Sequence, residues 1–325
     1  MKAICLHSGG LDSSLAIMLI RQQGIEPVAA HFISPFWGRE GESPAEVTAR
    51  WMGIEYIDVP MGEEYLDIVR NPGHGYGRNA NPCIDCHIHM LRKAAALMPE
   101  VGASFVVTGE VAGQRPMSQR MNTLRHIEKE SGLDGLLLRP LSARLLPETI
   151  PEKEGWVDRE KLLAISGRSR AVQMRLAEDL GLEHYSTPAG GCLLTDPGYS
   201  KRVRDLIAHG DLSMVQAARL KTGRHFRLPG GSKLVIGRNQ RENERLLKSL
   251  GEGDLAIITV SCPGPSAVLT GPDAASELDL AASMVARYGD DKSSPAIGMK
   301  FIGPGGPRAI SSGRMSPDEV AGLLI

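Results

Sequence analysis

Three of the five cysteines in this 325-residue chain lie where their thiols could do chemistry. Cys83 and Cys86 form a Cys-x-x-Cys pair within Asn-Pro-Cys-Ile-Asp-Cys-His, just before a segment with helical periodicity. Cys192 ends a Pro-Ala-Gly-Gly-Cys run that should be a loop. Thiolates bind soft metals, and a helix N-terminus lowers the pKa of a nearby thiol. We therefore treat Cys83, Cys86 and Cys192 as candidate catalytic residues and candidate metal ligands.

Four functions fit these three cysteines, beside incidental burial. A zinc ion would need a fourth ligand, for which His87 or His89 is available. A 4Fe–4S cluster held by three cysteines would leave one iron open. The other two functions are a disulfide redox pair and a persulfide on one cysteine that a second cysteine resolves. Cys5, inside a predicted strand, and Cys262, near the C-terminus, are expected to pack rather than react.

A second candidate site is the glycine turn within Cys5–Ser14, between a predicted strand and a predicted helix. Its two glycines let the backbone approach an anion, and the helix N-terminus offers unpaired N–H groups. Asp12 can hold Mg²⁺ or orient the loop. The residues expected to bind phosphate here are Ser8, Gly9, Gly10, Asp12, Ser13 and Ser14.

Two further segments should lie at the same edge of the sheet. Thr108 and Gly109 follow the predicted strand Phe105–Thr108, and Gln114 comes shortly after them. His31 lies near the end of another predicted strand. Ligands of open α/β sheets bind at the carboxyl ends of the strands, so these residues are added to the predicted nucleotide site.

The elements that must position these groups alternate between strands and helices, which predicts an α/β fold with a doubly wound parallel sheet. The predicted strands are Ala3–His7, Pro27–Phe32, Glu55–Val59, Phe105–Thr108 and Gly135–Leu138. The predicted helices are Ser13–Gln23, Leu91–Leu97, Ser118–Ser131, Asp158–Ser166 and Ser169–Leu180. Strands at Leu255–Val260, Ala267–Leu269 and Met299–Ile302 and a helix at Asp273–Tyr288 predict a smaller C-terminal α+β domain.

The net charge of −1 hides a segregation of charge along the chain. Between Tyr199 and Leu250 there are twelve basic and four acidic residues, so this segment carries +8 and the rest −9. A basic segment suits a nucleic-acid partner. A solvated face is the alternative, and the composition shift near Asp196 predicts a domain boundary there.

The Ser-Gly-Gly-Leu-Asp-Ser run resembles the PP-loop of the ATP pyrophosphatase superfamily. That resemblance implies that the loop binds the pyrophosphate part of ATP with Mg²⁺ while a substrate oxygen is adenylated. The run TGEVAGQRPMSQ and the later LLRPL resemble segments of tRNA 4-thiouridine synthetases. Together they imply an ATP-dependent enzyme of the thiouridine-synthetase type.

The cysteine motifs resemble two branches of the same superfamily. The Asn-Pro-x-x-x-Cys motif resembles that of tRNA 2-thiouridylases, which places Cys86 and Cys192 at that family's two catalytic cysteines. Cys83 departs from that pattern and resembles the third cysteine of cluster-dependent thiolases. The resemblance favours a 4Fe–4S cluster on Cys83, Cys86 and Cys192, with persulfide or disulfide chemistry, zinc or no metal as alternatives.

The C-terminal run KLVIGRNQRENERLL resembles the start of the RNA-binding domain of NFACT proteins. The aromatic and histidine residues usual after the Asp in that family are replaced here by Ala-Ile-Ile-Thr. The resemblance implies RNA contacts from Arg238, Asn239, Arg241 and Asn243. Together with the PP-loop resemblance, it implies a catalytic domain over residues 1–195, a basic connector over 196–232 and an RNA-binding domain over 233–325.

These features predict a tRNA sulfurtransferase that adenylates a uridine carbonyl and replaces its oxygen with sulfur. The expected partners are tRNA and an external sulfur donor, either a cysteine desulfurase or sulfide, and a homodimer is left open. No apolar run reaches the roughly 20 residues of a membrane helix and the start lacks a signal peptide, so a cytoplasmic protein is expected. Alternatives are sulfur insertion into a small molecule or protein, and a non-catalytic RNA-binding factor.

Overall fold

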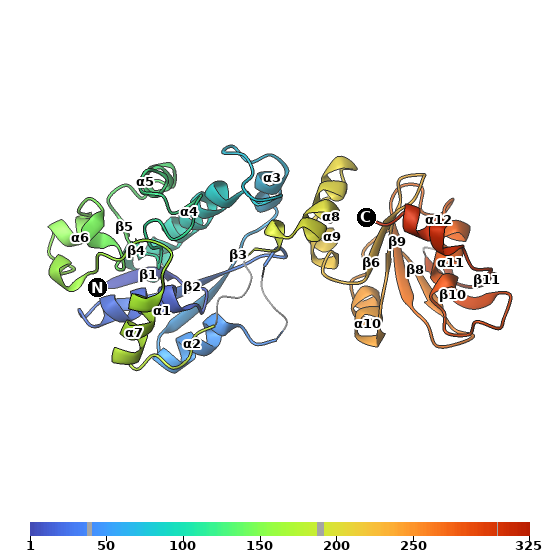
Figure 1. Ribbon diagram of the computed structural model, residues 1–325, viewed down its shortest axis with the longest axis horizontal. Coiled ribbons are helices and arrows are strands. Elements are labelled where there is room, and N and C mark those ends of the chain that lie inside the picture. Colours follow the sequence, from blue (N-terminus) through green and yellow to red (C-terminus); the bar gives the residue numbers. More distant parts are fainter. Residues whose placement is uncertain (38–40, 187–191, 304) are drawn as a thin grey trace. The chain divides into compact units, whose positions relative to one another are not determined.

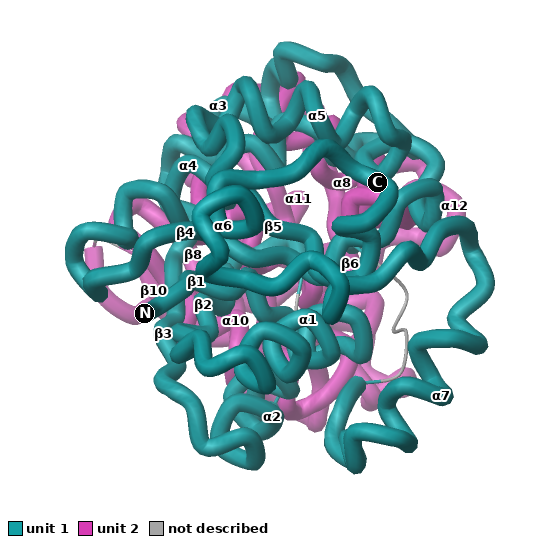
Figure 2. The backbone as a smooth tube through the Cα atoms, turned by 90° about the vertical axis from the view of Figure 1, so that its left-hand side faces the viewer, with its two compact units in different colours: residues 1–193 teal, residues 194–325 magenta. Residues whose placement is uncertain are grey.

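The computed structural model describes residues 1–37, 41–186, 192–303 and 305–325, and the chain divides into two compact units. The first unit is Met1–Leu193 and the second is Leu194–Ile325 (Figure 2). Within the described ranges, no helix combines the length and the apolar composition that a membrane crossing requires.

The first unit is built on five parallel strands in the order β3-β2-β1-β4-β5. Their bounds are β1 (Lys2–Leu6), β2 (Glu26–Ile33), β3 (Glu55–Pro60), β4 (Ala103–Val107) and β5 (Leu137–Leu138). The chain leaves β1 toward β2 on one side, and later returns to place β4 on the other side of β1. The carboxyl ends of β1 and β4 therefore form the switch point at which sheets of this kind bind ligands. The predicted doubly wound parallel sheet is confirmed.

Helices cover both faces of this sheet (Figure 1). Helices α1 and α2 lie on one face, and α4 and α5 on the other. Their bounds are α1 (Leu11–Arg21), α2 (Pro44–Met52), α3 (Glu64–Arg70), α4 (Cys83–Val101), α5 (Met121–Glu130), α6 (Ile150–Lys153) and α7 (Ala171–Asp179). Helix α1 is apolar on two sides because it packs between the sheet and α7.

Two helix predictions differ from the structure. Only the short 3₁₀ turn Arg159–Lys161 forms within Asp158–Ser166, so the predicted helix there is wrong. The backbone N–H of Leu163 instead donates to Pro140 O at 2.9 Å and that of Ile165 to Leu141 O at 2.8 Å, which holds this segment in an extended form. Helix α4 begins at Cys83, well before the predicted Leu91, so both cysteines of the Cys-x-x-Cys pair lie in its first turns.

The second unit is an antiparallel six-stranded sheet in the order β11-β10-β8-β9-β7-β6, with helices around it. The strands are β6 (Arg224–Arg227), β7 (Lys233–Ile236), β8 (Leu255–Thr259), β9 (Ser266–Thr270), β10 (Ile297–Gly303) and β11 (Gly306–Ser312). The helices are α8 (Pro197–Ala208), α9 (Met214–Arg219), α10 (Gln240–Lys248), α11 (Leu278–Arg287) and α12 (Pro317–Gly322). The expected smaller α+β domain is present, with its main core between the sheet and α11.

The residues predicted as a basic connector form folded elements of this unit. Residues 196–232 contain α8, α9 and β6, and the boundary between the units falls after Leu193. Strand β6 pairs with β7, and the backbone N–H of Ile325 donates to His225 O at 3.0 Å on the other side of β6. Because β6 has hydrogen-bond partners on both sides, it is part of the sheet. The basic composition of this segment did not predict that.

Candidate active site

The glycine turn joins β1 to α1 at the switch point, and its backbone fits only glycine at one position. Gly9 has a φ of +70°, and a Cβ there would lie 2.4 Å from the carbonyl carbon of Pro44. Gly10 is the N-cap of α1 in extended conformation. The turn therefore packs directly against the start of α2 while the first N–H groups of α1 face the carboxyl edge of the sheet.

The serines of this turn divide into two kinds. The buried Ser13 and Ser14 donate their hydroxyls to Gly10 O at 3.0 and 2.9 Å, so they hold the turn in shape. Ser8 is exposed, and its Oγ lies 3.4 Å from that of Ser13. Ser8 is thus the serine of this group whose hydroxyl is most accessible to a ligand.

The loop after β4 closes onto this turn, as its predicted place at the sheet edge requires. A Cβ on Gly109 would lie 2.5 Å from the carbonyl carbon of Asp12 and from the backbone nitrogen of Ser13. The Gln114 amide donates to Asp12 Oδ2 at 3.0 Å. The structure therefore brings Asp12, Gly109 and Gln114 together. Thr108 is buried and donates to Glu110 Oε2 at 3.0 Å, away from this contact.

Two histidines lie close to the turn. His31 Nδ1 is 2.9 Å from the Tyr56 hydroxyl and 3.0 Å from Asp58 Oδ1, so its imidazole is oriented by β3. His7 is buried, and within the described residues its ring nitrogens make no hydrogen bond of good geometry, with only a weak contact to the backbone of Ala45. Burial, with a smaller effect of the charge of His31, lowers the pKa of His7 to about 4.

We expect His7 to make the first unit sensitive to acid. Its pKa is lowered on folding, so below its ordinary value of 6.5 the unfolded chain binds a proton that the folded chain does not. This stability is complete above pH 6.5 and is lost as the pH falls to 4, by about 2–3 kcal/mol. Urea unfolding of H7L between pH 7 and 4.5 should show a flatter pH dependence than the wild type. H209Q, at an exposed histidine, is the control, and equal slopes in H7L and wild type would contradict the assignment.

The three candidate cysteines converge on Tyr65 of α3. Burial raises the pKa of Tyr65 well above its usual value, and Cys86, Cys192 and Cys83 raise it further. The Tyr65 ring packs on Trp37 with ring centroids 5.5 Å apart, and Cys192 Sγ lies 3.8 Å from Phe36 O. The thiols thus share one neighbourhood at the edge of the sheet. Gly190 and Gly191 of the predicted Gly-Gly-Cys loop lie outside the described residues.

The thiols differ in acidity. Burial raises the pKa of Cys86, and the Tyr65 hydroxyl only partly opposes this. Burial would also raise the pKa of Cys83, but the hydrogen bond and charge of His87, with Ser118 and Arg115, outweigh it and lower the value to about 7. Among the residues with described positions, no group of three or more His, Cys, Asp or Glu is arranged to hold a metal. The donor set suits a soft metal or a reactive thiolate.

A buried chain of charges next to Cys83 was not predicted from the sequence. His87 Nδ1 lies 3.0 Å from Glu110 Oε1, and Arg139 Nε donates to Glu110 Oε2 at 3.0 Å. Arg139 also donates to Glu128 Oε2 at 2.7 Å and its side chain is 1% exposed. Burial lowers the pKa of His87, but its bonds to Cys83 and Glu110 outweigh this and raise it to about 10. The chain links Cys83 to Glu110, which directly follows Gly109 of the predicted nucleotide site.

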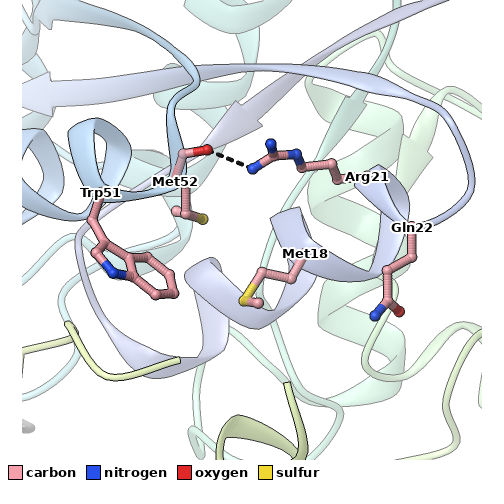
Figure 3. A pocket seen from close by; sticks show the side chains of 5 residues that line it. All are labelled: Met18, Arg21, Gln22, Trp51 and Met52. Carbon is pink, nitrogen blue, oxygen red and sulfur yellow. Dashed lines mark hydrogen bonds between the residues drawn. The ribbon is translucent and has the colours of Figure 1, made fainter. Parts of the chain in front are cut away.

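One pocket of the first unit lies away from these residues. It has a volume of about 490 Å³ and is lined by Met18, Arg21, Gln22, Trp51 and Met52 (Figure 3). Arg21 donates to the Met52 carbonyl across it. These residues belong to the C-terminal ends of α1 and α2, at the opposite end of α1 from the glycine turn. None of the predicted site residues lines it.

In the second unit, the four residues predicted to contact RNA have different surroundings. Asn239 caps α10 by accepting from the Glu242 N–H at 3.0 Å, and Asn243 accepts from the Ser266 N–H at 2.9 Å. Arg238 pairs with Glu242. Arg241 is exposed on α10. The two asparagines thus serve the local fold, Arg238 lies in an ion pair with Glu242, and Arg241 is exposed on the surface.

Several basic residues of the +8 segment are buried in ion pairs. Lys233 and Arg227 both contact Asp205, each at 2.7 Å, and Arg219 pairs with Asp254. The basic residues of the segment that are exposed are Lys201, Arg204, Lys221, Arg238, Arg241 and Lys248. The surface available to a polyanion is therefore smaller than the composition indicated.

Comparison with known families assigns both units. Residues 1–144 match the family described as thiamine biosynthesis protein (ThiI). Most of the first unit is therefore similar to ThiI proteins. Residues 223–322 match the family described as NFACT protein RNA binding domain, so the NFACT-type domain begins with β6, earlier than the predicted Lys233.

Several known relatives of the chain are tRNA-specific 2-thiouridylases by name. A bifunctional NifU/MnmA protein of Rubrobacter xylanophilus is 28% identical over 57% of this chain and 37% of its own length. A tRNA-specific 2-thiouridylase MnmA of Pelotomaculum thermopropionicum is 23% identical over 84% of this chain and 75% of its own length. A 4-thiouridine synthetase solved with RNA and ATP is 23% identical over 56% of this chain and 51% of that one, with a TM-score of 0.35. The chain spans little more than a third of the length of the first relative.

Proposed function

We propose that the chain is an ATP-dependent tRNA sulfurtransferase that replaces a uridine carbonyl oxygen with sulfur. The proposal rests on one observation. Three thiols and the glycine turn lie at one edge of a single sheet, and His87, Glu110 and Gly109 connect them. A pyrimidine carbonyl oxygen is a poor leaving group, so adenylation has to precede sulfur transfer. An edge that holds a nucleotide site beside thiols suits a reaction with both steps.

In the proposed reaction, the uridine carbonyl oxygen attacks the α-phosphorus of ATP and the bond to the β-phosphate breaks, releasing pyrophosphate. Sulfur then attacks the activated carbon, and the carbon–oxygen bond breaks to release AMP. The turn Ser8–Asp12 and the N–H groups of α1 would bind the phosphates, and Asp12 would hold Mg²⁺ through Oδ1. Asp12 Oδ1 is a buried oxygen with no partner among the described residues, which fits a cation ligand.

The sulfur would be handled by Cys83, Cys86 and Cys192. Their soft donor atoms fit a 4Fe–4S cluster, which would supply an open iron for sulfide, and persulfide chemistry or zinc is the alternative. Cys83, with a pKa of about 7, is more readily deprotonated at neutral pH than the buried Cys86, whose pKa is raised. The sulfur donor would be external, either a cysteine desulfurase or sulfide. The five cysteines are free thiols, and the location we propose is the cytoplasm, where thiols stay reduced.

The NFACT-type domain would supply affinity for tRNA through exposed basic residues such as Arg241 and Lys248. The target base of the tRNA would be bound by the PP-loop domain, which would carry out the chemistry. Removing charge from α10 should then weaken tRNA binding similarly for all tRNAs.

Substitution of the thiols tests the function. A strain without this protein should lose a thiolated tRNA nucleoside, measured by mass spectrometry of digested tRNA. Wild-type chain and C262S should restore it, whereas C86S and C192S should lower the rate by more than about 100-fold, as expected for a group that takes part in the chemistry. Cys262 lies in the second unit, against its core. If no thiolated nucleoside is lost from the deletion strain, the proposal fails.

The state of the thiols is read from the purified protein. An anaerobic preparation that is brown and absorbs near 400 nm favours the cluster. A colourless preparation with stoichiometric zinc excludes it, and a colourless metal-free preparation favours the persulfide.

A further inference from the structure

Next to the glycine turn, an arginine from a distant part of the chain faces Asp12. Arg170 precedes α7 as its N-cap residue, and its Nη2 lies 3.7 Å from Asp12 Oδ2. The same carboxylate oxygen accepts from the Gln114 amide at 3.0 Å. One oxygen of Asp12 thus faces both residues, and its other oxygen faces neither.

Polar atoms without protein partners gather at this point. Asp12 Oδ1, Gln114 Oε1 and Arg170 Nε are buried and have no hydrogen-bond partner within the described parts of the chain. One turn further along α7, the fully buried Gln173 also has both amide atoms unpaired there. Burying such atoms unpaired costs about 1–3 kcal/mol each, so a polar ligand that meets them would recover that energy.

The backbone holds Arg170 in this place. The Gly167 N–H donates to Ala112 O at 2.8 Å, and Ser166 bridges to Ala112 as a neighbouring strand would. Ala112 itself lies two residues before Gln114. Helix α7 then packs on α1, with Ala177 in the same core as Leu15. The loops that carry Arg170 and Gln114 are therefore hydrogen-bonded to each other, and this places both residues next to Asp12.

We propose that Arg170 is the cation that binds the phosphate chain of the nucleotide at this turn. The inference rests on the proposed function for the identity of the ligand, ATP. The glycine turn itself presents N–H groups and the α1 dipole but no Lys or Arg, unlike loops that carry their own lysine. A guanidinium with an unpaired Nε–H and a second N–H beside it matches two phosphate oxygens at once. Asp12 orients this fork when no phosphate is present.

Measuring the binding of different ligands distinguishes phosphate binding by Arg170 from a purely structural role. A phosphate-binding arginine affects ligands in proportion to their phosphates, whereas a residue that only holds Asp12 in place affects the melting temperature and all ligands alike. R170Q is the test variant, and R170K keeps the charge without the fork. R168Q is the matched control, because Arg168 lies on the same loop and is exposed.

Calorimetry with the full-length protein and Mg²⁺ measures binding of ATP, pyrophosphate and adenosine. We expect R170Q to weaken ATP and pyrophosphate binding by about 10- to 100-fold, R170K by less, and adenosine binding to be unchanged in both. R168Q should bind all three like the wild type. Wild-type-like affinity of R170Q for ATP and pyrophosphate, or an equal loss for adenosine, overturns the inference and leaves the proposed function standing. If wild-type protein binds none of the three, the proposed function itself fails.

Discussion

G109A should lose at least about 100-fold in activity and about 3 kcal/mol in stability. The added methyl would lie 2.5 Å from two backbone atoms of Asp12 and Ser13, and no rotamer change can relieve a clash with backbone. Overpacking costs about 1–3 kcal/mol where side chains can adjust, so a backbone clash falls at the upper end. Separating the loop after β4 from the glycine turn also displaces Gln114 from Asp12, and a misplacement of about 1 Å can cost 10²-fold in rate.

Two measurements separate these effects. Thermal unfolding of the purified variant reports the stability, and ATP binding below its melting temperature reports the geometry of the site. G322A is the matched control, because a Cβ on Gly322 meets nothing within 4 Å. Its stability should be unchanged or slightly raised, since alanine favours the helix. A G109A protein that binds ATP like the wild type would show that the two loops need not touch.

The parts of the site that the sequence revealed are those with local signals. The turn from Ser8 to Asp12 is recognisable because a short apolar strand, two glycines and an amphipathic helix follow each other within about 20 residues. Parallel topology then placed Gly109 and Gln114 at the same edge, and the structure brings both to Asp12. Local pattern and sheet topology together were sufficient for this half of the site.

Contacts between distant, irregular segments were not predictable in the same way. Arg170 reaches Asp12 from a segment 158 positions later, and no periodicity connects the two. The segment before it was predicted helical because its leucines have helical spacing, yet Leu163 and Ile165 pair with Pro140 and Leu141 through their backbones. Tertiary hydrogen bonds overrode a weak local preference there.

Other misjudged roles had a signal that could have been used. Asn239 followed three residues later by Glu242 is a helix-capping pattern, and the structure uses Asn239 in that way. Arg139 stands inside the apolar run Leu-Leu-Arg-Pro-Leu, where a charge requires a buried acidic partner. The sequence therefore predicts that Arg139 has an acidic partner. It does not show that this partner is Glu110, 29 residues earlier.

R139M should destabilise the first unit by about 3–5 kcal/mol, because it leaves the carboxylates of Glu110 and Glu128 without their shared cation. Burial would raise the pKa of Glu110, but the charges of Arg139 and His87 outweigh this and lower it to about 2. A lowered carboxyl pKa stabilises the fold above its ordinary value of 4.5, and this contribution is lost as the pH falls toward 2. The difference in the free energy of unfolding between wild type and R139M should therefore have its full value at pH 7.

The matched control is R144M, because Arg144 lies 3.9 Å from Glu160 and its side chain is 48% exposed. Exposed pairs contribute at most about 1 kcal/mol, so chemical denaturation should place R144M within that range of the wild type. E110Q with R139M in a double-mutant cycle then measures the pair itself. If the double variant is no less stable than R139M alone, the cost arises from the carboxylate left unpaired. If R139M is destabilised less than R144M, the buried chain of charges between Cys83 and the predicted nucleotide site does not stabilise this edge of the sheet.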